Sequence, residues 1–251
     1  MRNLLLNLSY NGKNYHGWQI QKNARTVQQV FQESLFKTLG EQVDIKGCSR
    51  TDSGVHANMY CVSFKTNSTI PEEKLPFALN KFLPDDICVY SCKLVSDDFH
   101  ARYSCSGKEY IYKIWNSPFK NPFLDGYALH YWYPLDIIKL NEACKEFLGK
   151  HDFSAFCTKD ARNPKNMIRT IKNFNVQKEN ELVTITVEAD GFLYNMVRIL
   201  VGTLLHVSMG RIKICDIKDI INSKDRLKAG PTAIPCGLYL NRVFYPGVDF
   251  C

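Results

Sequence analysis

Residues 48–57 read CSRTDSGVHA, and the prediction of the fold depends on this short polar stretch. It brings an acid, a base, hydroxyls and an imidazole together between two segments with strand-like sequences. Loops of this composition often carry function. Serine, aspartate and glycine also favour turns for purely local reasons, so the residues alone favour a simple connection between two strands.

Outward from this loop, the chain predicts a mixture of strands and helices. Thr26 and Gln29 form a capping-box pattern ahead of an amphipathic helix that ends at Gly40. Hydrophobic periodicity predicts further helices at residues 71–82, 136–148 and 195–207. Strands are expected at residues 3–10, 43–48, 59–65, 87–95, 109–115, 172–177 and 182–189. The order of strand, helix and paired strands occurs twice, so we expect two halves that pack as one body with a cleft between them.

Bulk composition describes an ordinary globular chain with a basic character. Its 251 residues are 45% hydrophobic, enough for one large domain or two small ones. A formal net charge of +7 favours polyanionic partners. The ten cysteines include no C-x-x-C pair, so free thiols are expected. The N-terminus lacks a signal-peptide core or membrane span, which predicts a cytoplasmic protein with no membrane partner.

Three further features have both a functional and an ordinary interpretation. Arg198 lies on an apolar helix, so its charge needs a carboxylate or anion unless the side chain reaches the surface. Tyr110 lies on a predicted strand, where core packing is the common role of tyrosine. The basic segment at residues 159–169 suits either a phosphate backbone or a solvated loop. Motifs for nucleotide cofactors and clustered metal ligands are absent from the sequence, so neither a cofactor nor a metal is expected.

The segment CSRTDSGVHA resembles the aspartate motif, G-R-T-D-x-G-V-H-A, of the tRNA pseudouridine synthases that act on positions 38 to 40 of the anticodon arm. Ser49 stands where the motif has glycine, which affects the local geometry of the loop. The resemblance continues along nearly the whole chain. It includes HGWQ at residues 16–19, FHARY at 99–103, KEYIY at 108–112, MVR at 196–198 and GLYL at 237–240.

This resemblance implies an α+β pseudouridine synthase fold, with two similar halves whose antiparallel sheets form a central basic cleft. Residues 1–105 would form the N-terminal half, and residues 106–246 the C-terminal half. The implied catalytic residues are Asp52 as nucleophile, Tyr110 against the target uridine, and Arg198 paired with Asp52. Arg50, His56 and Tyr110 would bind substrate, and Arg50 would help displace the flipped base. The implied partners are tRNA, through its anticodon stem-loop, and a second copy of the chain in a homodimer.

The implied reaction moves the ribose from a nitrogen to a carbon of the uracil ring, so it needs no cofactor or metal. Two alternatives stay open. A paralogous synthase acting on another RNA, such as ribosomal RNA, would have the same catalytic loop. An RNA-binding or RNA-folding protein with secondary catalysis would depend less on Asp52.

Overall fold

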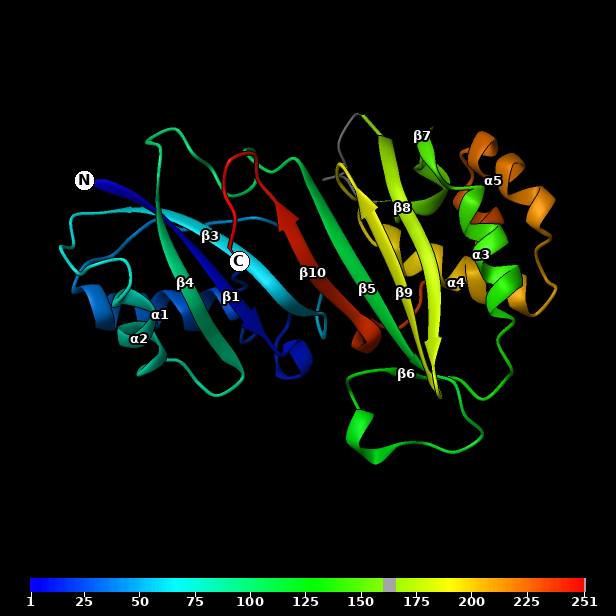
Figure 1. Cartoon of the computed structure of the whole chain (residues 1–251), viewed down its shortest axis with the longest axis horizontal. Helices are drawn as coiled ribbons and strands as arrows, with labels where there is room; N and C mark the ends of the chain where they lie inside the picture. Colours follow the sequence, from blue (N-terminus) through cyan, green and yellow to red (C-terminus); the bar gives the residue numbers. More distant parts are fainter. Residues whose placement is uncertain (160–165, 251) are drawn as a thin grey trace. The chain divides into compact units, whose positions relative to one another are not determined.

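The computed structural model describes residues 1–159 and 166–250, which form two compact units (Figure 1). Unit 1 contains Met1–Ser106 together with the chain from Tyr239 onward, and unit 2 contains Gly107–Leu238. The sequence-based division assigned residues 239–246 to the second half. They lie in unit 1 because the last strand of the chain pairs with a strand of that unit.

The sheet of unit 1 has the strand order β4-β1-β3-β10. Its strands are β1 (Arg2–Tyr10), β2 (Lys46–Gly47), β3 (His56–Thr66), β4 (Ile87–Val95) and β10 (Leu238–Phe244). Strand β1 pairs antiparallel with both β3 and β4. Strand β2 also pairs antiparallel with β3, whereas β10 runs parallel to β3, with Leu240 opposite Ala57. The parallel pair departs from the purely antiparallel sheet that the resemblance implies.

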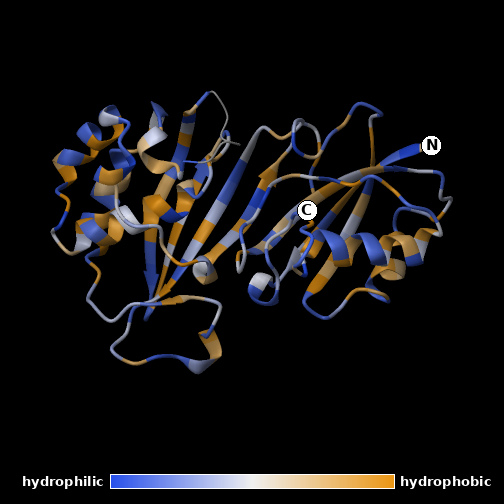
Figure 2. Cartoon of the chain, turned by 180° about the vertical axis from the view of Figure 1, so that it is seen from behind, coloured by the Kyte–Doolittle hydropathy of each residue, from blue (hydrophilic) through white to orange (hydrophobic). Residues whose placement is uncertain are grey.

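Two helices cover one face of this sheet, α1 (Val27–Leu39) and α2 (Leu75–Asn80) (Figures 1 and 2). The N-cap of α1 is Thr26, whose hydroxyl accepts a hydrogen bond from the Gln29 amide, and Gly40 ends the helix at φ +70°. Phe31 and Leu35 of α1 are fully buried against the sheet side of the unit. A 3-10 turn at Gly12–Asn14 follows β1.

Unit 2 has the strand order β5-β9-β8-β7. Its strands are β5 (Gly107–Trp115), β6 (Leu129–His130), β7 (Gly149–Asp152), β8 (Ile168–Glu179) and β9 (Leu182–Ala189). The main pairs are antiparallel, and the short β6 runs parallel to β5. Hydrophobic and hydrophilic residues alternate along the strands of both units (Figure 2), which leaves one side of each strand for the core.

The helices of unit 2 are α3 (Ile137–Lys145), α4 (Met196–Ser208) and α5 (Ile217–Ser223). Nearly every side chain of α4 is buried, as its apolar sequence predicts. Helix α3 packs on β8 and α4, which joins the helical layer to the sheet. Short 3-10 turns complete the unit at Pro122–Leu124, Ser154–Phe156, Ile214–Asp216, Arg226–Lys228 and Pro235–Gly237.

Most predicted elements are confirmed, including the helix after Thr26, the strand at residues 87–95 and the hairpin of β8 and β9. Three predictions were too long, and one of them is the helix expected at residues 136–148, which ends at Lys145. The helix expected at residues 71–82 is regular only from Leu75, because Pro76 has no amide hydrogen and fits only the first turn. The strand expected at residues 43–48 is reduced to Lys46–Gly47, the residues that pair with β3.

Two other sequence-based expectations concern membranes and thiols. Every described cysteine is free, as expected. Among the described residues, no helix has the length and apolar character needed to cross a bilayer. Of the basic segment at residues 159–169, residues 160–165 lie outside the described residues.

Candidate active site

The polar loop between β2 and β3, residues 49–55, is fixed in unit 1 by the segment that follows β1. The Trp18 amide donates to the Thr51 carbonyl at 3.2 Å, and the Gly54 amide donates to the Tyr15 carbonyl at 3.2 Å. The hydroxyls of Tyr10 and Thr51 share a buried hydrogen bond of 2.8 Å. Backbone and side chain thus both hold the loop, so its residues have defined positions before any substrate binds.

Two glycines allow this close approach of backbone to backbone. A Cβ atom on Gly17 would lie 2.4 Å from the Thr51 carbonyl oxygen, and the residue has a φ of +84°. A Cβ atom on Gly12 would lie 2.0 Å from the Val55 carbonyl oxygen. Since real side chains never approach so closely, any larger residue at these positions would move the loop.

The carboxylate of the loop belongs to Asp52, which is half-buried, while the neighbouring Arg50 is exposed. The Asp52 carbonyl accepts a hydrogen bond from the Val55 amide at 3.2 Å, which closes a turn just after the acid. The turn expected from Asp-Ser-Gly is therefore present. It coexists with two tertiary hydrogen bonds, from the Trp18 amide to the loop and from the loop to the Tyr15 carbonyl, which a simple surface connection would not need.

His56 lies beneath the loop at the start of β3, with 1% of its surface exposed. Its Nδ1 accepts a hydrogen bond from the Gly12 amide at 3.1 Å, and its ring stacks on Tyr239 with centroids 4.6 Å apart. These contacts describe a residue that supports the loop from below. They favour a supporting role over the direct substrate contact that the sequence-based prediction gave to His56.

Tyr110 occupies β5 of unit 2, opposite Val187 of β9. As predicted, Tyr110, Tyr112 and Ile114 share one buried face of the strand. The ring of Tyr110 meets Phe192 edge to face, with centroids 5.0 Å apart. The hydroxyl of Tyr112 instead donates to the Ile234 carbonyl at 2.7 Å, and burial raises the pKa of Tyr112 well above its ordinary value.

Arg198 lies in the first turn of α4 and is half-buried. Its Nε donates to the Ala233 carbonyl at 2.7 Å, and Nη1 donates to the Asn195 side-chain oxygen at 2.9 Å. Asn195 caps the helix in a left-handed conformation, at φ +61°, and its amide nitrogen donates to the Thr158 hydroxyl at 3.0 Å. Hydrogen bonds to the Ala233 carbonyl and to the Asn195 side chain thus orient the guanidinium.

Residues 230–234 form a loop that holds Arg198, and its role was missed in the sequence. The Ala233 amide also donates to the Arg198 carbonyl at 3.1 Å, so residues 198 and 233 are joined twice. The Gly230 amide donates to the Thr203 hydroxyl at 2.9 Å. A Cβ atom on Gly202 would lie 1.8 Å from the Pro231 carbonyl oxygen. In the sequence, the pair Gly230-Pro231 predicts a turn, but it does not indicate which residues the turn contacts.

The residues of the predicted site are divided between the two units. Unit 1 places Arg50, Asp52 and His56 on or under one loop, and unit 2 places Tyr110 and Arg198. The ion pair between Asp52 and Arg198 joins residues of different units, and it stays a prediction. Among the described residues, no group of three or more histidine, cysteine or acidic side chains has an arrangement that could hold a metal ion.

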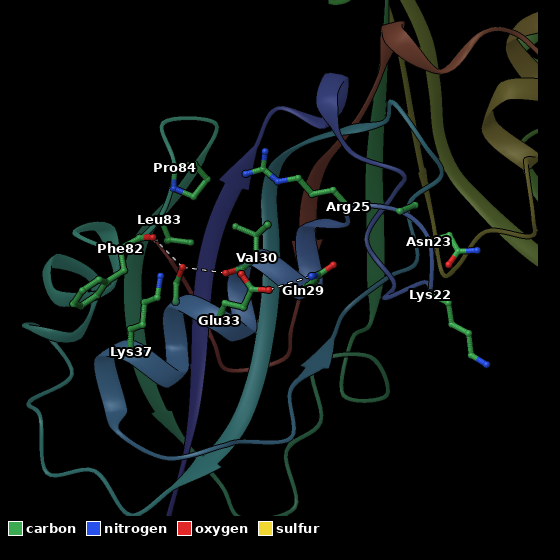
Figure 3. Close-up of a pocket in the computed structure, with 12 residues that line it drawn as sticks. Lys22, Asn23, Arg25, Gln29, Val30, Glu33, Lys37, Phe82, Leu83 and Pro84 are labelled. Atoms are coloured by element: carbon green, nitrogen blue, oxygen red, sulfur yellow. Dashed lines mark hydrogen bonds between the residues drawn. The ribbon is translucent and has the colours of Figure 1, made fainter.

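A separate hollow of about 650 Å³ lies on unit 1 beside α1 (Figure 3). Lys22, Arg25 and Lys37 give it a basic rim, and Glu33 accepts a hydrogen bond from Gln29 on its wall at 3.1 Å. The described residues that line it include none from the loop at residues 49–55, so it is distinct from the candidate site.

Comparison with known proteins places these features in a family. A family model described as tRNA pseudouridine synthase matches residues 8–104 and 143–246. These segments include Asp52 and Arg198, whereas Tyr110 falls in the interval between them. The chain is 50% identical over 245 residues to tRNA pseudouridine synthase A of Thermoanaerobacter sp. (strain X514), covering 98% of this chain and 100% of the relative.

Other relatives agree with this match. The tRNA pseudouridine synthase A 2 of Clostridium tetani (strain Massachusetts / E88) is 48% identical over 246 residues, covering 97% of this chain and 99% of the relative. Among solved structures, a chain of a Cbf5-Nop10-Gar1 complex covers 94% of this chain and 57% of its own length, with 13% identity and a TM-score of 0.38. A score at this level carries no argument, so the family assignment depends on the sequence matches.

Proposed function

Because the chain belongs to the tRNA pseudouridine synthase family, an isomerase family with the pseudouridine synthase fold, we propose that it converts uridine to pseudouridine at positions 38, 39 and 40 of the tRNA anticodon stem-loop. The observation that carries this proposal is the placement of Asp52. Its carboxylate lies on a loop that tertiary hydrogen bonds hold in place, and the motif around it matches the family.

In the proposed reaction, a carboxylate oxygen of Asp52 attacks C1′ of the target uridine while the bond between C1′ and N1 breaks. The released uracil rotates, C5 forms a new bond to C1′, and the bond to Asp52 breaks. C5 loses a proton and N1 gains one, so product and substrate have the same composition and oxidation state. A carboxylate suits this double displacement, as it does in retaining glycosidases, because it is both a nucleophile and a leaving group.

Tyr110 is proposed to lie against the target uridine. The position is supported by a rigid setting, since the ring is buried on β5 and contacts Phe192 edge to face. Placing a catalytic group on a central strand fixes it better than a surface loop would.

Arg198 is proposed to pair with Asp52. The support is the orientation of the guanidinium, which donates hydrogen bonds to the Ala233 carbonyl and to the Asn195 side chain. These bonds fix the direction of the side chain, and a carboxylate within about 4 to 6 Å of the guanidinium would be attracted strongly.

Access to C1′ requires the target uridine to leave the base stack, at a cost of a few kcal/mol. We propose that the exposed Arg50 helps to displace the base and that contacts of lysines and arginines with the RNA backbone offset the cost. His56 contributes indirectly, by supporting the loop through Gly12 and Tyr239.

The test is to incubate the chain with unmodified tRNA transcripts that carry uridine at positions 38, 39 or 40. Pseudouridine is then mapped at nucleotide resolution by carbodiimide modification and primer extension. We expect product at these positions from the wild type and none from Asp52→Ala, which should still bind the transcript. Asp85→Ala is the matched control, because it makes the same change at an exposed aspartate of unit 1 outside the loop.

Each alternative has its own result in this experiment. Equal product from Asp52→Ala and the wild type would remove Asp52 from the mechanism and favour an RNA-binding protein. Product in ribosomal RNA fragments, with none in tRNA, would favour the paralogous synthase. For Arg198→Leu we expect a folded chain without activity, whereas full activity would show that the ion pair is unnecessary.

A homodimer is part of the same proposal. It predicts a particle of twice the 28.9 kDa chain mass in light scattering after gel filtration. A particle with the mass of one chain at micromolar concentration would contradict it.

A further inference from the structure

A pocket of about 300 Å³ opens in unit 1 directly beside the loop that carries Asp52. Four segments that are distant in the sequence form its wall, and two of its residues, Ser49 and Arg50, belong to that loop. The other residues on which its chemistry depends are Trp18, Lys46, His100, Arg102 and Tyr103.

The rim of the pocket is strongly basic. Lys46, Arg50 and Arg102 are all exposed cations, and the Nζ of Lys46 lies 2.5 Å from a carboxylate oxygen of Asp44. Burial, and then the charges of Lys46 and Arg102, lower the pKa of His100, while Asp44 acts in the opposite direction. The pocket therefore has a positive potential, which favours an anionic ligand.

Tyr103 adds an aromatic surface to this charge. Its side chain is 76% exposed, yet the turn that presents it is held firmly. The His100 Nδ1 accepts from the Arg102 amide at 3.0 Å, and the His100 carbonyl accepts from the Tyr103 amide at 3.0 Å. The turn is also anchored to the core, because the Ala101 amide donates to the Ser63 hydroxyl at 2.9 Å. An exposed ring on an anchored turn is suited to contact with a ligand rather than to packing.

The neighbours of Tyr103 strengthen this interpretation. The His100 ring lies 4.4 Å from it between centroids, and the Arg102 guanidinium lies 5.8 Å from its centre. Aromatic side chains interleaved with cations are the usual means by which proteins bind unpaired nucleotides, because bases stack on the rings and phosphates meet the cations.

The floor of the pocket is rigid and linked to the Asp52 loop. Trp18 is buried and stacks on Tyr60 with centroids 4.0 Å apart. A Cβ atom on Gly47 would lie 2.4 Å from the Tyr60 hydroxyl oxygen, so only glycine fits there without a shift. The Tyr60 hydroxyl donates to the Ser49 carbonyl, and the Trp18 amide donates to the Thr51 carbonyl at 3.2 Å. A ligand on this floor is therefore held in a fixed relation to the loop.

We propose that this pocket binds the RNA nucleotide next to the target uridine, with its phosphate between Arg50 and Arg102 and its base on the ring of Tyr103. Arg50 is two residues from Asp52, and two residues of chain span at most about 7 Å. This length is comparable with the rise of one or two stacked nucleotides, at about 3.4 Å each. A nucleotide held here would keep its neighbour near Asp52. The inference rests on the proposed function, since it takes Asp52 as the reacting group.

The test is a binding cycle on an anticodon stem-loop oligonucleotide, using the Asp52→Ala chain so that no reaction occurs. Tyr103→Ala, Tyr103→Phe and Arg102→Gln are compared, with Lys74→Gln as control, because Lys74 is an exposed cation of unit 1 outside the pocket. Loss of one base stack is worth about 1 to 3 kcal/mol, so Tyr103→Ala should raise Kd by about five-fold to 150-fold. Tyr103→Phe should bind like the parent.

Two further readouts separate base stacking from phosphate binding. Two oligonucleotides are compared, one without the base on the 5′ side of the target and one without the base on its 3′ side. With one of the two, Tyr103→Ala should raise Kd no further, because the base that stacks on Tyr103 is already absent. Arg102→Gln should lower the slope of log Kd against log salt by about one, whatever the sequence. Equal Kd values for Tyr103→Ala and Lys74→Gln, or no coupling to either missing base, would overturn the proposal.

The same variants, made with Asp52 intact, are then assayed for pseudouridine. If the wild type forms no pseudouridine in any RNA, the proposed function fails, whereas the binding cycle still reports on the pocket. If the wild type is active and Tyr103→Ala retains its affinity and its single-turnover rate, only the pocket proposal fails.

Discussion

Gly202→Ala tests whether the loop at residues 230–234 holds α4 and Arg198 as tightly as the contacts indicate. Gly202 lies inside α4, where helix propensity alone favours alanine over glycine by about 1 kcal/mol. The added Cβ atom would lie 1.8 Å from the Pro231 carbonyl oxygen, about 1.6 Å closer than the 3.4 Å at which ordinary contacts begin. Because that atom is backbone, the loop or the helix must move as a whole.

Overpacking of this kind costs about 1 to 3 kcal/mol. Displacement of the loop also weakens the hydrogen bond from Gly230 to Thr203 and the double link between residues 198 and 233, at about 0.5 to 1.5 kcal/mol for each bond lost. After the gain in helix propensity, we expect Gly202→Ala to lower the free energy of unfolding by about 2 kcal/mol. Helix propensity alone would raise the free energy of unfolding of Gly202→Ala, so the expected change has the opposite sign.

The assay is urea unfolding followed by circular dichroism, with the midpoint and slope fitted separately. Gly191→Ala is the matched control, because its Cβ atom would meet only the Arg169 side chain at an ordinary 3.5 Å. That control should stay within about 0.5 kcal/mol of the wild type. A Gly202→Ala chain as stable as the wild type, with an unchanged slope, would refute the close contact between α4 and the loop.

Two further predictions concern residues of unit 2. Asn195→Gly keeps the left-handed helix cap but removes the acceptor for Arg198 and the hydrogen bond to Thr158. We expect the free energy of unfolding to fall by about 0.5 to 1.5 kcal/mol for each bond lost and the single-turnover rate to fall as well. An unchanged rate would show that Asn195 does not orient Arg198. Burial opposes ionisation of Asp152, but hydrogen bonds from Ser154 and Lys224 outweigh it and lower the pKa below its ordinary value. The Asp152 carboxylate therefore stabilises the fold above its unfolded pKa of about 3.9, and this contribution is lost as the pH falls through its folded pKa. The difference in free energy of unfolding between the wild type and Asp152→Asn should thus become smaller on acidification. A difference that does not depend on pH would contradict this assignment.

Local signals explain why much of the fold was predictable. The cap at Thr26 and the stop at Gly40 act within one helical turn, so the sequence alone identifies α1. Helix α4 follows from its continuous apolar composition, and β8 and β9 from alternation on either side of Asn180, which takes a φ of +52° at the turn. In each case the deciding interactions lie close together along the chain.

The features that escaped prediction depend on partners that are distant in the sequence. Strand β10 has no strong pattern of its own, and its place follows from pairing with β3. The acceptors Asn195 and Ala233 of Arg198 lie on a helix cap and on a loop 35 residues away. A charged residue on an apolar helix indicated that Arg198 needs a partner, but the sequence did not identify these residues. The family resemblance implies that His56 binds substrate, and this stays a prediction; its burial and its stack on Tyr239 come from tertiary packing, which the motif alone does not indicate.

The parallel pairing of β10 with β3 affects the order in which the protein is completed during translation. Asn58 of β3 and its hydrogen-bond partner Asn241 of β10 are separated by 183 residues of chain. At about 5 to 20 residues per second, a ribosome needs roughly ten to forty seconds to synthesise that interval. During this time the start of β3, directly after the Asp52 loop, has an uncovered edge, and His56 lacks the Tyr239 ring that stacks on it. The support beneath the loop therefore arrives only once residue 239 is synthesised, so premature termination before that residue leaves a chain that contains every proposed catalytic residue but lacks this support.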